Sequence, residues 1–360
     1  MSDHHNKRIL VTGATGFLGS YLVRYLLHAG YRNIRALRRP DSQLDLLGEA
    51  AGQVEWVEGD VLDIGALEEA LEGCQWVFHS AAIVSFDSRD AARMREINVE
   101  GTANVVNLCL YEGVEKLLHV SSVSALGRTK PGLTLSEASK WEKSPYNTNY
   151  GNSKFQAEQE VWRGIEEGLP AVIIQPAVVL GSGRWTEGPS AFFKTIYEGL
   201  RYYPPGGSAF VDVRDTVRMM VQLMASGLVR ERFIASAGNW SYQELFRQIA
   251  LALEKQPPSV QVNGLLRGLA WRAAWLKSRV SGQPSLITRE TAMQSANNFF
   301  YDNQKSLQQL DFQYIPLETT IRETAQQFLE AVREPSLFSK VLPFSGSEDF
   351  LSIQTQHDQG

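Results

Sequence analysis

Residues 11–19 read Val-Thr-Gly-Ala-Thr-Gly-Phe-Leu-Gly, and this stretch decides the fold. It follows the basic and apolar run 7–10 and precedes an amphipathic stretch, which predicts a short strand, a glycine turn and the start of a helix. Gly13, Gly16 and Gly19 would allow a tight turn, close approach of a pyrophosphate and helix–strand packing. The free N–H groups of the helix would face the anion. Glycines also mark ordinary turns, but the flanking strand and helix favour a dinucleotide-binding turn.

The composition is that of an ordinary globular protein, with 360 residues, 43% of them hydrophobic and 21% charged. The formal charge of −5 argues against a nucleic-acid partner. No signal peptide and no apolar run long enough to span a bilayer is visible, so we expect a cytoplasmic location. Cys74 and Cys109 lack CxxC spacing and predict reduced thiols. The six histidines have no metal-ligand spacing, so we expect no metal site.

The first half of the chain alternates strand and helix patterns, which predicts an α/β fold with a doubly wound parallel sheet, the Rossmann type, and a smaller C-terminal substrate-binding lobe. We expect strands near 33–38, 54–59, 76–81, 116–121 and 171–175, and helices near 20–29, 64–71, 91–111 and 149–167. Beyond residue 180, glycines and prolines interrupt the pattern. The predicted domains are 6–180, to which 208–238 returns, a lobe of 181–207 with 239–333, and a polar tail of 334–360.

Tyr150 and Lys154 stand four residues apart at a predicted helix start, which places both side chains on one face. An ammonium beside a tyrosine favours the phenolate and lowers the phenol pKa, so the pair suits proton transfer. Ser121 and Ser122 close a predicted strand, where ligands of parallel sheets bind. Singly, these residues are also compatible with a helix surface and a strand cap. In this order, after the glycine turn, they predict a catalytic group.

On these motifs the chain resembles the extended short-chain dehydrogenase/reductases, from about Lys7 to Phe328. The resemblance implies Ser122, Tyr150 and Lys154 as catalytic residues, with Lys154 also binding the nicotinamide ribose. It further implies contacts to a nicotinamide cofactor from the glycine turn, the end of the second strand, an adenine motif, a backbone segment, a supporting asparagine, the catalytic pair and the segment after the sixth strand. These residues are Gly13, Thr15, Gly16, Phe17, Leu18, Gly19, Arg38, Arg39, Asp60, Val61, Ser80, Ala81, Ala82, Asn98, Tyr150, Lys154, Pro176 and Val179.

The choice of cofactor is predicted from the end of the second strand. An acid there would accept the ribose hydroxyl of NAD, whereas a guanidinium accommodates the extra phosphate of NADP. The strand ends in Arg38-Arg39-Pro40 without an acid. In the resemblance to dihydroflavonol-reductase-like members, Arg39 falls on the phosphate-binding arginine. We therefore expect NADP, with NAD as the alternative.

The residues expected to contact the substrate favour a reductase that acts on a small-molecule ketone or aldehyde with a largely hydrophobic body. Nucleotide-sugar enzymes of the family typically carry cations where Gln175 and Ser208 stand here. Aromatic residues are expected to line the pocket instead, although each could belong to the core of the lobe: Phe86, Tyr146, Trp185, Phe192, Phe193, Tyr197, Tyr202 and Tyr203. The alternatives are an NAD-dependent nucleotide-sugar epimerase or dehydratase, and a cofactor-sensing or assembly protein without turnover.

Two further surfaces are expected from the sequence. Residues 255–289 contain no Asp or Glu, and 265–280 combines basic residues with tryptophans. This predicts a lid helix on the substrate lobe, with membrane-surface contact as the alternative. Family members often form homodimers through a helical bundle, which here would use 93–110 and 155–166.

Overall fold

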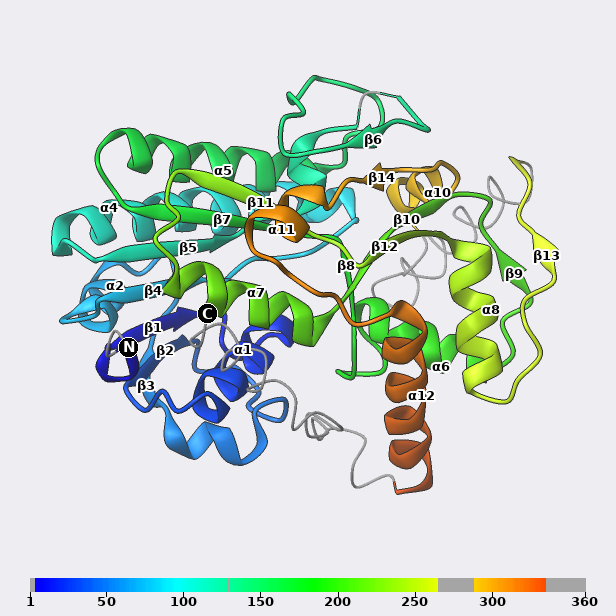
Figure 1. Cartoon of the computed structure of the whole chain (residues 1–360), viewed down its shortest axis with the longest axis horizontal. Helices are drawn as coiled ribbons and strands as arrows, with labels where there is room; N and C mark the ends of the chain where they lie inside the picture. The colour runs from blue at the N-terminus through cyan, green and yellow to red at the C-terminus, as the bar shows by residue number, and fades with distance from the viewer. Residues whose placement is uncertain (1–3, 129, 265–287, 335–360) are drawn as a thin grey trace.

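Seven parallel strands form the centre of the protein (Figure 1). The computed structural model describes residues 4–128, 130–264 and 288–334. In spatial order the strands are β11 (Glu231–Ala235), β7 (Ala171–Pro176), β5 (Lys116–Val120), β4 (Trp76–His79), β1 (Ile9–Thr12), β2 (Ile34–Arg38) and β3 (Glu55–Glu58). Every neighbouring pair is parallel. The order reverses beside β1, so the predicted doubly wound sheet is confirmed.

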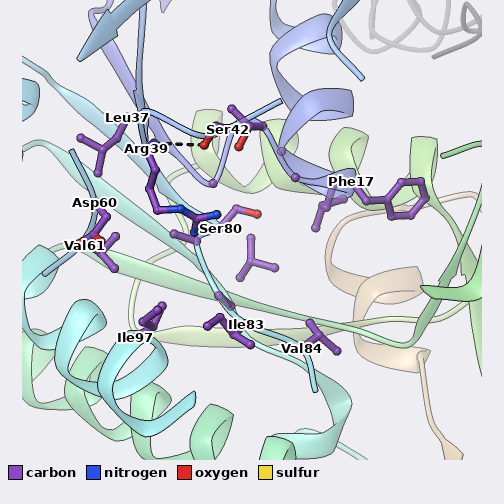
Figure 2. A pocket seen from close by; sticks show the side chains of 18 of the residues that line it. Phe17, Leu37, Arg39, Ser42, Asp60, Val61, Ser80, Ile83, Val84 and Ile97 are labelled. Carbon is purple, nitrogen blue, oxygen red and sulfur yellow. Dashed lines mark hydrogen bonds between the residues drawn. The ribbon is translucent and has the colours of Figure 1, made fainter. Parts of the chain in front are cut away.

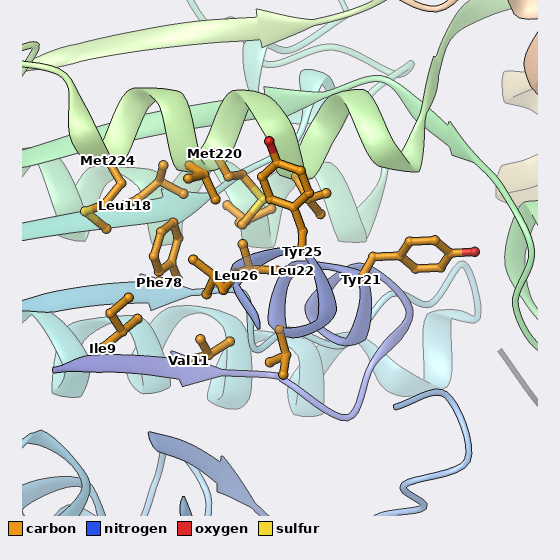
Figure 3. Packing of buried hydrophobic residues seen from close by; sticks show 14 of the residues in the cluster. Ile9, Val11, Tyr21, Leu22, Tyr25, Leu26, Phe78, Leu118, Met220 and Met224 are labelled. Atoms are coloured by element: carbon orange, nitrogen blue, oxygen red, sulfur yellow. The ribbon is translucent and has the colours of Figure 1, made fainter. Parts of the chain in front are cut away.

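Helices cover both faces of this sheet, which explains why its strands are almost continuously apolar (Figure 1). One face carries α1 (Phe17–His28) and α7 (Val213–Ala225), and the other carries α2 (Ile64–Leu71), α4 (Gly101–Glu112) and α5 (Asn149–Glu166). Figure 3 shows the first face, where side chains of α1 and α7 meet those of the strands. Because successive strand residues point to opposite faces, Leu10, Val77 and Leu117 enter the other core.

The predicted helix 91–111 is interrupted. It consists of α3 (Ala91–Arg95), a π-helical turn (Glu96–Glu100) and α4. A π-helical turn inserts a residue into the helical ladder and is common at functional sites. Here it holds Asn98, whose side chain turns toward the backbone of Ile83. Periodicity alone did not reveal this interruption, because the flanking turns keep the α-helical pattern.

The C-terminal lobe contains a small second sheet and several helices (Figure 1). Its sheet has the order β12 (Gly238–Ser241), β10 (Gly207–Asp212) and β8 (Val178–Leu180), and its larger helices are α6 (Ala191–Tyr197), α8 (Tyr242–Ala252) and α12 (Leu317–Arg333). Shorter elements are β6 (Thr134–Leu135), β9 (Tyr202–Tyr203), β13 (Val260–Gln261), α10 (Arg289–Gln294), β14 (Phe300–Tyr301) and α11 (Gln304–Gln309). Within 208–238, β10 pairs with β8, which lies inside the predicted domain 6–180, but it does so in the small sheet rather than in the main one. Phe210 of this strand packs in the core of the lobe, whereas β11 and α7 join the main sheet.

The lobe uses several of its aromatic side chains as core. Trp185 and Phe193 are fully buried with Phe328, and the Trp185 ring lies edge-on to that of Phe328 at 5.1 Å. The prediction that Trp185 and Phe193 line a pocket is therefore wrong, because the lobe needs them to close its own hydrophobic centre.

Three expectations concern the surface and the thiols. The predicted lid segment 265–280 and the tail from 335 onward lie outside the described residues. Within the described part of the chain, no helix has the length and apolar character to cross a bilayer. Cys74 and Cys109 are free thiols and both are buried.

The core shown in Figure 3 gives a first prediction. Phe78 of β4 is fully buried between the sheet and α1. We expect Phe78→Ala to lower the free energy of unfolding by about 3–5 kcal/mol, because it removes apolar contacts and leaves a cavity. Urea unfolding followed by circular dichroism measures this change. The control Tyr111→Ala, at a side chain that is 81% exposed, should change it by less than about 0.5 kcal/mol; equal effects would contradict the packing.

Candidate active site

The glycine turn joins β1 to α1 by contacts between backbones. A Cβ atom on Gly19 would lie 2.1 Å from the carbonyl oxygen of Gly13, and one on Gly13 would lie 2.6 Å from the amide nitrogen of Ala81. Gly13 also has a φ of +72°, which side-chain-bearing residues rarely adopt. Gly16 begins α1 without a side-chain cap, so the first N–H groups of the helix are left for a ligand. This cradle fits the pyrophosphate of a dinucleotide.

A cavity of about 590 Å³ opens in front of this turn, at the carboxyl ends of the central strands. Nearly all of the predicted cofactor and catalytic residues line it. They are Gly13, Thr15, Gly16, Phe17, Leu18, Gly19, Arg38, Arg39, Asp60, Val61, Ser80, Ala81, Ala82, Ser122, Tyr150, Lys154, Pro176 and Val179. Segments that are far apart in the sequence thus converge on one cavity. Among the described residues, no group of three or more His, Cys, Asp or Glu side chains is placed to hold a metal ion.

Asn98 is the exception, because it is buried behind the wall of the cavity. Its Oδ1 accepts the N–H of Ile83 at 2.7 Å, and its Nδ2 donates to the carbonyl of Ile83 at 2.9 Å. Nδ2 also donates to the Ser153 hydroxyl at 3.0 Å. The prediction of Asn98 as a cofactor contact is therefore corrected. Asn98 instead holds the backbone of Ile83, which lines the cavity, and links it to Ser153 of α5.

A buried row of polar side chains connects this asparagine to the glycine turn. The Thr102 hydroxyl donates to the Asn98 carbonyl at 2.6 Å, and it lies 2.9 Å from Nε2 of His79. His79 Nδ1 lies 2.8 Å from the Thr12 hydroxyl. The Thr102 hydroxyl already donates its one proton to Asn98, so it can only accept from His79. Nε2 of His79 therefore carries the proton, and Nδ1 accepts from the Thr12 hydroxyl. Burial, with the charge of Lys154, lowers the pKa of His79 to about 3, which keeps this neutral tautomer in place.

Ser122, Tyr150 and Lys154 all line this cavity, so the structure brings the three predicted catalytic residues together. Ser122 lies just beyond β5, and its hydroxyl is hydrogen-bonded to that of Tyr150. Tyr150 lies in the first turn of α5, which Thr148 caps through the N–H of Gly151 at 2.9 Å. The cap sets the start of the helix and thereby the direction of the tyrosine.

The effect of Lys154 on Tyr150 differs from the expectation. Burial raises the pKa of Tyr150 to about 12, and only the bond to Ser122 opposes this rise. Lys154 donates to the carbonyl of Val120 at 2.7 Å, and burial lowers its pKa to about 8. Hydrogen bonding to backbone thus takes the place of the expected ammonium–phenol pairing. In this arrangement the tyrosine is held as a neutral phenol.

Glu158, which the motifs did not predict, is a buried acid near Lys154. It is buried one helical turn after Lys154, and its charge raises the lysine pKa against the effect of burial. Its Oε1 lies 2.9 Å from Nη1 of Arg232, and its Oε2 accepts from Ser121 at 2.7 Å and from Gln175 at 2.8 Å. The i, i+4 spacing from Lys154 on one face of α5 was the available signal.

The opposite end of the cavity is lined by the two arginines that end β2. Figure 2 shows the Arg39 side chain reaching into the cavity toward Ser80, with the Arg39 backbone N–H donating to Ser42 at 3.2 Å. Arg38 lies 4.0 Å from Glu58. Arg39 Nε lies 3.3 Å from Oδ1 of Asp41, an acid three residues beyond the end of the strand. Asp41 is 80% exposed, however, which makes this ion pair weak.

The cavity also has walls that the motifs did not mark. These residues are Leu37, Asp41, Ser42, Gln43, Ile83, Val84, Ile97, Val120, Ala177 and Arg184. Most of them adjoin a motif residue in the sequence, and proximity to the motif was their only signal. Arg184 comes from a loop beyond β8, where the sequence pattern is irregular.

Comparison with known proteins assigns the chain to a family. Residues 9–234 match the model of the NAD dependent epimerase/dehydratase family. The chain belongs to this family. It is therefore an NAD(P)-dependent enzyme of the extended short-chain dehydrogenase/reductase group, as its motifs predict.

Two curated relatives and one solved structure illustrate the similarity. The chain is 30% identical to "Putative dihydroflavonol 4-reductase" of Synechocystis sp. over 88% of this chain and 93% of that protein. It is 34% identical to sterol demethylase protein B of Methylococcus capsulatus over 63% of this chain and 69% of that protein. The crystal structure of gox2253 superposes with a TM-score of 0.76 at 30% identity, covering 91% of this chain and 99% of that one.

The close backbone contacts of the turn give a second prediction. We expect Gly19→Ala to abolish measurable dinucleotide binding, because the added Cβ would displace the Gly13 carbonyl and open the turn. Isothermal titration with NADP⁺ and NAD⁺ measures the loss. Gly52→Ala is the matched control, since a Cβ there would meet nothing within 4 Å. Retained affinity in Gly19→Ala would mean that the cradle is not the binding site.

Proposed function

We propose that this protein uses NADPH to reduce a ketone or aldehyde on a largely hydrophobic substrate, with Tyr150 as the proton donor. The proposal rests on the observation that Ser122, Tyr150 and Lys154 line the same cavity as the glycine turn. When bound, the cofactor supplies a hydride to the carbonyl carbon. The protein then has to orient the carbonyl, deliver a proton to its oxygen and exclude unproductive poses.

Proton delivery follows from the state of Tyr150. A phenol with a pKa near 12 is fully protonated at neutral pH, so it can donate to a carbonyl oxygen that becomes negative during reduction. The Ser122 hydroxyl, bonded to Tyr150, is placed to donate to the same oxygen. Lys154, which donates to the carbonyl of Val120, would also hold the nicotinamide ribose.

The preference for NADPH is supported by the cations at the end of β2. Arg38 and Arg39 both line the cavity, and a guanidinium matches a phosphate through paired N–H donors. The exposed Asp41 pairs with Arg39 only weakly, so an incoming phosphate can replace it. These two arginines would bind the 2′-phosphate.

A hydrophobic substrate is supported by the side chains around the tyrosine. The ring of Phe86 lies 6.0 Å from that of Tyr150, and Val84 is 63% exposed at the cavity. Exposed apolar groups beside a reactive centre are typical of apolar ligand sites. The names of the two relatives, a 4-reductase and a sterol demethylase protein, agree with a carbonyl on an extended apolar body.

The nucleotide-sugar alternative requires cations for a substrate diphosphate. Gln175 is fully buried and donates to Glu158, while Ser208 is buried in β10. Neither can supply the charge that a desolvated diphosphate needs. A screen of NADPH oxidation with graded aldehydes and ketones, run beside dTDP- and UDP-sugars, separates the two functions. Turnover of only the sugar nucleotides would overturn the proposal.

Substitution of Tyr150 tests the mechanism. We expect Tyr150→Phe to lower kcat/KM for the carbonyl by about 100- to 10,000-fold, because the ring remains but the proton donor is lost. The dissociation constant for NADPH, measured by fluorescence titration, should stay within about twofold of the wild-type value. Wild-type turnover in this variant would refute the assigned role.

Substitution of Arg39 tests the cofactor preference. We expect Arg39→Ala to weaken NADPH binding by about 10- to 100-fold, the loss typical of a charge-assisted hydrogen bond. NADH binding serves as the internal control and should change little, because NADH lacks the 2′-phosphate. If wild-type protein binds NADH more tightly than NADPH, the proposed preference is wrong.

A further inference from the structure

An ion pair joins two loops at the edge of the dinucleotide cavity. Nη2 of Arg184 lies 2.5 Å from Oδ1 of Asp45, and Nε of Arg184 lies 3.1 Å from Oδ2 of the same residue. This is the bidentate geometry of a strong arginine–carboxylate pair. Both side chains are largely buried, with 23% and 22% exposed. Arg184 follows β8, whereas Asp45 follows β2, so the pair connects the lobe to the dinucleotide-binding sheet.

The loop that carries Arg184 packs against the first turn of α1. A Cβ on Gly183 would lie 2.9 Å from Cδ2 of Phe17, the first residue of that helix. The Tyr21 hydroxyl donates to the carbonyl of Ser182 at 2.7 Å. Figure 3 shows this tyrosine at the end of the α1 core, with its hydroxyl pointing away from the other labelled side chains. These contacts fix the position of Arg184 relative to the N-terminus of α1.

The N-terminus of α1 is where a pyrophosphate would bind, and Arg184 is a cation positioned by that helix. Among the described residues, the other Lys and Arg side chains that line the cavity would face other parts of the dinucleotide. Arg38 and Arg39 would lie near the adenosine, and Lys154 would lie near the nicotinamide. Beside the N-terminus of α1, the helix N–H groups and Arg184 are therefore the donors that would meet two negative phosphates.

The donor inventory of Arg184 leaves room for such a contact. A guanidinium has five N–H donors, and Asp45 accepts from only two of its nitrogens. Nη1 lies 3.6 Å from Glu187, which is longer than an ordinary hydrogen bond, and the Glu187 side chain is 65% exposed. Asp45 thus anchors one edge of the guanidinium without using all its donors.

We propose that Arg184 is a cofactor-binding residue that donates to the pyrophosphate of the dinucleotide, and that Asp45 holds it at the edge of the cavity for this purpose. The inference rests on dinucleotide binding, which NAD and NADP share, and is independent of the carbonyl substrate. Asp45 would keep the long arginine side chain in place before the cofactor arrives, which lowers the entropy lost on binding.

The test measures binding rather than turnover. We expect Arg184→Met to weaken NADP⁺ and NAD⁺ by the same factor of about 10- to 100-fold in isothermal titration. Asp45→Asn keeps the shape of the anchor but removes its charge, and we expect it to weaken both dinucleotides by about 3- to 10-fold through faster dissociation. 2′-AMP, which carries the adenine and the 2′-phosphate but no pyrophosphate, should bind all variants with unchanged affinity.

Arg163→Met is the matched control. Arg163 also makes two acid pairs, with Glu160 and Glu167, but it lies on α5 away from the cavity. Its dinucleotide affinity should equal that of the wild type, and the melting temperature of each unliganded variant reports folding. Unchanged dinucleotide affinity in a folded Arg184→Met variant would overturn the proposal. A loss confined to NADP⁺, or shared with 2′-AMP, would also overturn it because the contact would then be to the 2′-phosphate.

Discussion

The close approach of backbones at the glycine turn is the constraint on which the rest of the site depends. Gly19 lies directly on the carbonyl of Gly13, and Gly13 lies on the backbone of Ala81. These contacts bring the end of β1, the start of α1 and the segment after β4 together without intervening side chains. The uncapped N-terminus of α1 is thereby aimed at the cavity, and the backbone at 80–82 becomes its wall.

The part of the cavity lined by Tyr150 and Lys154 is positioned relative to this turn by buried polar groups. From Thr12, at the end of β1, hydrogen bonds run through His79 and Thr102 to Asn98. Asn98 then donates to Ser153 on α5, the helix that carries Tyr150 and Lys154. Hydrophobic packing alone is non-directional, whereas each hydrogen bond in this row requires one orientation. The row therefore specifies how α5 sits relative to the cofactor turn, and the neutral state of His79 preserves it.

The strands, the helices around the sheet and the convergence of the motif residues on one cavity could be predicted from the sequence, because all three depend on local patterns. The buried strands read as apolar runs, and the glycines mark the positions where backbones touch. Asn98 was assigned to the wrong role because a π-helical turn, invisible to periodicity, directs it behind the wall. Glu158 and Arg232 were missed because their pairing joins α5 to β11 and the two residues are 74 positions apart in the sequence.

The aromatic residues of the lobe show a second limit of prediction from sequence. A scattered set of aromatics satisfies both a pocket and a small hydrophobic core, and composition cannot separate the two. Trp185 and Phe193 are core because they pack with Phe210, Phe328 and the other apolar side chains that fill the centre of the lobe. Phe86 lies beside Tyr150 instead, because the segment after β4 is held against α5 through Asn98.

The cations of the cavity are each accompanied by an acid, and the exposure of that acid differs along the cavity. Arg39 faces Asp41, whose side chain is 80% exposed, whereas the acid beside Arg184 is 22% exposed and Glu158 below Lys154 is fully buried. Water screens an exposed pair and leaves the cation free to change partner, while a buried pair keeps its geometry. The end that would distinguish NADP from NAD is thus the most adaptable part of the site. The end that would carry the chemistry is the most rigid. This difference suits both tasks, because cofactor discrimination depends on binding, whereas catalysis depends on groups held in a fixed geometry.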